Sequence, residues 1–93
     1  MAGEYQRSDV RYRGRVQGVG FRYTTRQIAS SYAVTGFVRN LPDGGVRVVV
    51  EGPPQEVKEF LDEIQRRLGD YIEAVDTKTT SATGEFSGFE IAF

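Results

Sequence analysis

Residues 9–22, DVRYRGRVQGVGFR, contain the change of hydrophobic period that decides the fold. Up to residue 16, apolar side chains or glycine alternate with charged ones, which is typical of a strand with one buried and one solvated face. From Phe21 onward, the small and apolar residues recur at helical spacing. They are Phe21, Thr25, Ile28, Ala29 and Tyr32. We therefore predict a strand, a glycine-rich turn and an amphipathic helix.

The same patterns continue along the chain. Residues 35–41 and 46–51 are strand-like, and the Pro-Asp-Gly-Gly sequence at 42–45 predicts a hairpin turn between them. A second helix is expected after Pro54, because a proline is accepted in the first turn of a helix. Its apolar stripe consists of Val57, Phe60, Leu61, Ile64 and Leu68. Strands at 71–79 and 89–93 complete the chain.

This order, β-α-β-β-α-β with one short extra strand, predicts a ferredoxin-like α/β sandwich of the α+β class. We expect an antiparallel sheet of four to five strands with two helices on one face. The 93 residues suit a single small domain, at residues 8–93, after a flexible polar tail at residues 1–7. No apolar run approaches the ~20 residues of a membrane span, and no export signal is visible. We therefore expect a cytoplasmic protein with no membrane partner. We also expect a monomer, because no unusual apolar patch is visible in the sequence.

The composition narrows the possible chemistry. Cysteine and histidine are both absent, which excludes a zinc site of the usual kind, a cysteine nucleophile and a serine–histidine pair. We expect no metal and no cofactor. The net charge is only −1, but residues 1–47 carry eight arginines against three acidic residues, and the second half of the chain is acidic. This asymmetry fits either two solvated faces or an anion site in the first half.

The glycine-rich turn itself favours the anion site. Successive backbone N–H groups without a Cβ in the way can surround an oxyanion, and the helix that follows adds the positive end of its dipole. The segment matches neither the dinucleotide-binding glycine motif nor the P-loop motif, so a smaller anion is expected. Arg22 would lie in the first helical turn, where the dipole opposes a cation, and a bound phosphate would offset that cost.

Two segments together, VQGVGFR at 16–22 and GFVRNLPDG at 36–44, resemble the acylphosphatase family. The resemblance extends from about residue 11 to residue 93, and Phe37 stands where many members have tryptophan. It implies the ferredoxin-like fold and the hydrolysis of acyl phosphates to a carboxylate and inorganic phosphate. It also implies that Arg22 binds the phosphate and Asn40 orients the attacking water. The implied phosphate loop is formed by Gln17, Gly18, Val19, Gly20, Phe21 and Arg22.

The implied partner is a small-molecule acyl phosphate, with inorganic phosphate as product and competitive inhibitor. Two alternatives remain. Ferredoxin-like domains can bind RNA through aromatic residues on the open face of the sheet, but here the first strand presents arginines there and the chain is acidic overall, so no nucleic-acid partner is expected. The second alternative is a domain that binds a phosphorylated metabolite without catalysis. From its residue type alone, Asn40 could also simply prepare the turn at 42–45.

Overall fold

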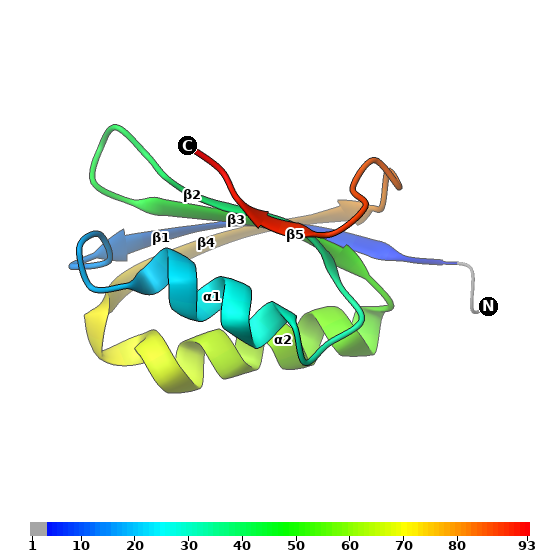
Figure 1. The fold of residues 1–93 in the computed structure, drawn as a ribbon, viewed down its shortest axis with the longest axis horizontal. Coiled ribbons are helices and arrows are strands. Elements are labelled where there is room, and N and C mark those ends of the chain that lie inside the picture. Colours follow the sequence, from blue (N-terminus) through cyan, green and yellow to red (C-terminus); the bar gives the residue numbers. More distant parts are fainter. Residues whose placement is uncertain (1–3) are drawn as a thin grey trace.

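The computed structural model describes residues 4–93 as one sheet covered by two helices (Figure 1). The strands and helices follow the predicted order, with a short 3-10 turn at Gly69–Tyr71 before the fourth strand. Their bounds are β1 Gln6–Gly14, α1 Phe21–Ala29, β2 Thr35–Asn40, β3 Val46–Gly52, α2 Pro54–Leu68, β4 Ile72–Ser81 and β5 Phe89–Ile91. The predicted ferredoxin-like fold class is confirmed.

The sheet has the strand order β4-β1-β3-β2-β5 and is mixed. Strands β1 to β4 pair antiparallel, whereas β5 pairs parallel with β2. The direction of β5 follows from the connections. Both β1 and β2 run opposite to β3, and β4 runs opposite to β1, so a chain that leaves β4 and turns back across the sheet runs in the direction of β2. The last strand therefore departs from the antiparallel pattern expected from the sequence.

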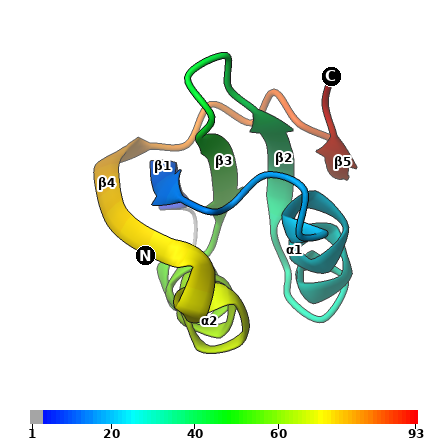
Figure 2. The ribbon, with the colours of Figure 1, turned by 90° about the vertical axis from the view of Figure 1, so that its left-hand side faces the viewer.

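The helices cover one face of the sheet, α1 beneath β2 and β5 and α2 beneath β1 and β3 (Figure 2). The predicted alternation of β1 is confirmed, because Val10 and Tyr12 are buried against the helices while Arg11 and Arg13 are exposed. Strand β4 forms one edge of the sheet, and all of its residues except the half-buried Ile72 are exposed. The buried side chains of the helices are Phe21, Thr25, Ile28, Ala29, Val57, Phe60, Ile64 and Leu68.

The beginning of β1 corrects part of the predicted tail. Gln6 and Arg7 belong to the strand and pair with β3 and β4, while residues 1–3 lie outside the described part of the chain. Polar side chains do not predict a strand by themselves. Here the strand forms because β3 and β4 offer backbone hydrogen bonds on both sides. No helix within residues 4–93 has the length and apolarity that crossing a membrane requires.

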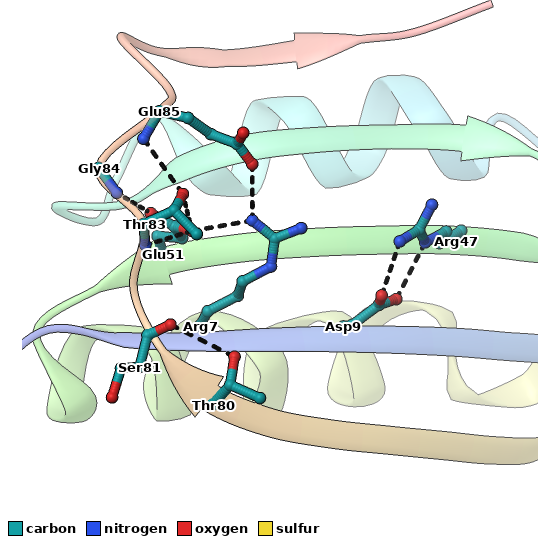
Figure 3. A network of polar contacts seen from close by, with 9 residues as sticks. All are labelled: Arg7, Asp9, Arg47, Glu51, Thr80, Ser81, Thr83, Gly84 and Glu85. Atoms are coloured by element: carbon teal, nitrogen blue, oxygen red, sulfur yellow. Dashed lines mark hydrogen bonds and ion pairs between the residues drawn. The ribbon is translucent and has the colours of Figure 1, made fainter.

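A buried carboxylate fixes the loop between β4 and β5 (Figure 3). The Glu51 side chain is 3% exposed and accepts hydrogen bonds from the backbone N–H groups of Thr83 and Gly84 and from the Thr83 hydroxyl. Arg7 donates to Glu51 at 3.0 Å and to Glu85 at 2.7 Å. The loop that leads to β5 is thereby tied to β1 and β3.

This network predicts acid sensitivity. Burial would raise the pKa of Glu51, but the hydrogen bonds from Thr83, Gly84 and Arg7 outweigh it and hold the pKa below its ordinary value of 4.5. A lowered pKa in the folded state stabilises the protein above pH 4.5, and this contribution is lost as the pH falls through the lower, folded-state value. We expect Glu51→Gln to lower the free energy of unfolding at pH 7 by about 1–3 kcal/mol and to flatten the acid limb of the stability curve.

Urea unfolding between pH 3 and pH 7 measures both effects. Asp62→Asn is the matched control, because Asp62 forms an exposed helical ion pair with Lys58, a type worth only about 0.3–0.5 kcal/mol. If Glu51→Gln and Asp62→Asn behaved alike at pH 7, the buried network would not stabilise the fold.

Candidate active site

The turn between β1 and α1 depends on two glycines. Gly18 and Gly20 have φ angles of 80° and 77°, in the left-handed region where side-chain-bearing residues are strained. A Cβ placed on either residue would meet no atom within 4 Å, so both face open space. The turn thus presents its backbone to solvent.

The N-terminus of α1 has no internal cap. Gly20 occupies the N-cap position without a side-chain hydrogen bond, and the first turn contains no acidic residue. The first backbone bond of the helix runs from the Thr24 N–H to the Gly20 carbonyl. Within residues 4–93, no hydrogen bond is formed by the N–H groups of Gly18, Gly20, Phe21, Arg22 or Tyr23. These donors and the positive end of the helix dipole remain available to an anion.

Arg22 adds a full positive charge at the same point. Its side chain is half-buried, and no carboxylate within the described residues pairs with it. Two other half-buried arginines differ, since Arg7 pairs with Glu51 and Glu85, and Arg47 pairs with Asp9 at 2.7 Å. The five N–H donors of the Arg22 guanidinium are therefore not committed to an acidic side chain.

Asn40 is the last residue of β2 and lies next to the glycine-rich turn. Strand alternation places its side chain on the same face as that of the fully buried Val38, while the intervening Arg39 is exposed on the other face. The Asn40 carboxamide is half-buried and makes no hydrogen bond within residues 4–93. It can therefore both donate to and accept from a bound molecule.

The Gln17 side chain connects the glycine-rich turn before α1 to the β2–β3 turn. Its Nε2 donates to the carbonyls of Leu41 and Gly45, both at 2.8 Å. The same two residues close the β2–β3 turn, in which the Leu41 N–H donates to the Gly45 carbonyl. The turn before α1 is thus fixed relative to the end of β2. The sequence assigned Gln17 only a backbone role, because nothing local predicts where its carboxamide reaches.

A pocket of about 250 Å³ brings the predicted residues together. Gly18, Gly20, Phe21, Arg22 and Asn40 all line it, whereas Gln17 and Val19 of the predicted loop do not. Because the Phe21 side chain is buried in the core, its free N–H is the part that can serve the pocket. Val16 and Tyr23 also line the pocket, although their residue types and spacing do not predict a place in the site.

Two larger hollows fit an anion less well. One, of about 610 Å³, lies between the start of β1 and the loop after β4 and has an acidic residue, Glu4, but no cation in its lining. The other, of about 380 Å³, lies over β1 and β4 and mixes Asp9 and Asp76 with Arg11 and Lys78. Of these three hollows among the described residues, the pocket at α1 is the one in which an arginine without a carboxylate partner lies beside the free backbone N–H groups of a helix N-terminus, the combination that binds phosphate-like groups.

The comparison with known proteins agrees with this geometry. The family model described as Acylphosphatase matches residues 8–91. An acylphosphatase of Arthrobacter sp. (strain FB24) is 43% identical over 99% of this chain and 85% of its own length. An acylphosphatase of Syntrophotalea carbinolica is 41% identical over 94% of this chain and 96% of its own length. The crystal structure of acylphosphatase from Bacillus subtilis superposes with a TM-score of 0.85 at 25% identity, covering 95% of this chain and 99% of that one. This chain belongs to the acylphosphatase family.

Proposed function

We propose that this acylphosphatase cleaves acyl phosphates in the pocket at the start of α1. The loop from Gln17 to Arg22 supplies backbone donors for the phosphoryl group, Arg22 supplies the positive charge, and Asn40 orients the attacking water. The observation that carries this assignment is the meeting, in one pocket, of unpaired backbone N–H groups, an arginine without a carboxylate and a carboxamide without a partner. We further propose that residues 8–93 act as one catalytic unit.

The chemistry suits a chain without histidine. Water attacks phosphorus, the bond between phosphorus and the acyl oxygen breaks, and the electron pair leaves on a carboxylate. Because a carboxylate is stable near neutral pH, the leaving group needs no strong general acid. The proton of the water passes to a phosphoryl oxygen, so Asn40 only has to position the water and never acts as a strong base.

The acceleration comes mainly from positioning and charge. Phosphoryl transfer leaves little covalent chemistry to the protein, and donors fixed in advance around the equatorial oxygens stabilise the transition state. The N–H groups of Gly20, Phe21 and Arg22 belong to a helix end, which cannot turn away from the substrate. Gln17 anchors the loop to the β2–β3 turn, which keeps the phosphoryl group and the water at a constant separation.

Inorganic phosphate is the probe that tests this pocket. As a product with the same equatorial oxygens, it is expected to inhibit acetyl phosphate hydrolysis competitively and to protect the chain against thermal unfolding. In ¹H–¹⁵N NMR spectra, phosphate should shift the backbone signals of residues 18–23 and the Asn40 side chain. Sulfate, which is also tetrahedral, serves as a second anion. If phosphate did not compete with acetyl phosphate, or if the NMR signals that it shifts belonged only to β4, the reaction could not take place in this pocket.

The alternative functions are less well supported. On the open face of the sheet, the Phe37 ring packs against Phe86 and lies beneath the guanidinium groups of Arg39 and Arg47. It is therefore not free to stack on a nucleic-acid base, as RNA recognition would require. Binding without catalysis is also disfavoured, since the relatives at 43% and 41% identity are acylphosphatases. We propose a monomer, because few large apolar side chains are exposed within residues 4–93, namely Tyr5, Tyr23, Val75 and Phe93.

A further inference from the structure

The segment after β5 reaches the candidate active site. The Ala92 N–H donates to the Val38 carbonyl at 2.9 Å, which continues the parallel pairing of Val38 with Ile91. In this register, residue 93 follows the course of β2 toward Asn40. The Phe93 ring lies over the guanidinium of Arg22, with 5.2 Å between the Arg22 Cζ and the ring centroid.

The Phe93 side chain is not a core residue. It is 96% exposed, the most exposed large apolar side chain within residues 4–93. Burial of apolar area therefore does not explain its place against Arg22. The contact that the structure gives the ring is the one with the cation.

An aromatic ring holds an arginine in a way that suits phosphate binding. A carboxylate would occupy the N–H groups at the edge of the guanidinium and would neutralise its charge. A ring contacts the flat face instead and leaves the N–H groups at the edge free. Arg7 shows the contrasting arrangement, because it lies over the Phe86 ring and also pairs with two carboxylates.

We propose that Phe93 is a positioning residue for Arg22. The ring restricts the guanidinium to the orientation that meets the phosphoryl group, so less side-chain entropy is lost when substrate binds. Phe93 itself touches no reacting atom. This role rests on the proposed function, in which Arg22 is the phosphate ligand.

The test compares Phe93→Leu, which keeps an apolar side chain but has no aromatic face, with Phe93→Tyr, which keeps the face. For Phe93→Leu we expect KM for acetyl phosphate and the inhibition constant of phosphate to rise roughly two- to fivefold, as an exposed cation–π contact of about 0.5–1 kcal/mol implies. Phe93→Tyr should retain the wild-type values. Tyr5→Leu is the control, because Tyr5 is also an exposed aromatic residue but lies at the start of β1 and does not line the pocket at α1.

A double-mutant cycle with Arg22 separates the possible failures. If Phe93 acts through Arg22, Phe93→Leu has no further effect on phosphate inhibition in the Arg22→Ala background. The positioning role would be overturned if Phe93→Leu left KM and phosphate inhibition unchanged, or if it had the same effect on phosphate inhibition in the wild type and in Arg22→Ala. Neither result would contradict the phosphate site itself. If Arg22→Ala itself left phosphate binding unchanged, the proposed function and the role of Phe93 would fall together. The melting temperature of Phe93→Leu should match the wild type, because the side chain is exposed.

Discussion

Replacing Arg22 with alanine is expected to lower kcat/KM for acetyl phosphate by about 10²–10³-fold, the loss that follows removal of a donor aimed at transition-state charge. Both substrate binding and the rate should suffer, because in the proposed mechanism the guanidinium contacts the phosphoryl oxygens before and during the reaction. Inhibition by phosphate should weaken in parallel. Steady-state kinetics with acetyl phosphate, with and without phosphate, measure all three quantities.

Arg26 provides the matched control for this experiment. It lies one turn further along α1, is exposed, and forms no ion pair within the described residues. Arg26→Ala removes the same charge from the same helix and should leave kcat/KM within about twofold, since the interaction between exposed charges is strongly screened. Arg22→Lys keeps the charge but not the bidentate geometry, so it should restore only part of the activity. If Arg22→Ala and Arg26→Ala lowered kcat/KM equally, Arg22 would act only through the overall positive charge of the helix and not through a direct contact with phosphate.

The stability of the variants must be known before the kinetics are interpreted. Arg22 has neither a carboxylate partner nor a place among the buried core residues. Its position in the first turn of α1 is unfavourable for a cation, so alanine there should leave the free energy of unfolding unchanged or raise it by about 0.3–1 kcal/mol. A variant that is inactive but at least as stable as the wild type would show that Arg22 serves the ligand and not the fold.

Much of the fold could be predicted because its signals are local. The alternation of β1 and the apolar stripe of α2 each lie within one stretch of sequence. The structure buries Val10 and Tyr12 of β1 and the expected residues of α2 except Leu61, which is half-buried. The turn before α1 was predictable for the same reason. Gly18 and Gly20 adopt φ angles that favour glycine, so the sequence itself marks a loop with an open backbone.

What the sequence did not predict depends on contacts between distant segments. Gln17 reaches the carbonyls of Leu41 and Gly45 through a carboxamide that could have pointed elsewhere. Phe93 meets Arg22 only because β5 joins the edge of the sheet next to β2. From the sequence we expect Arg7 in a flexible tail. In the structure it belongs to β1, because its backbone pairs with β3 and β4 and its side chain donates to Glu51. Residue type and spacing carry no information on such pairings until the strand order is known.

Asn40→Ala is expected to separate catalysis from binding. The variant should lose about 10²-fold or more in kcat, because a water that is no longer held in line attacks far less often. KM and the inhibition constant of phosphate should change little, since in the proposed mechanism the carboxamide faces the water and not the equatorial oxygens. This pattern differs from that of Arg22→Ala, in which binding and rate fall together, and the same two assays distinguish the variants.

The place of Asn40 in the strand makes the experiment clean. Its backbone pairs with Val46 in the sheet, and alanine keeps that pairing, while the carboxamide has no hydrogen bond within residues 4–93 to lose. Arg39→Ala is the control, because Arg39 is the preceding residue of β2 but is exposed on the opposite face. Asn40→Asp sharpens the result further. The aspartate is nearly isosteric and still accepts from water, but its negative charge faces the phosphate site, so phosphate inhibition should weaken where Asn40→Ala leaves it intact. If Asn40→Ala retained full kcat, the water would have to be oriented by another group, and Asn40 would remain only the residue that leads into the β2–β3 turn.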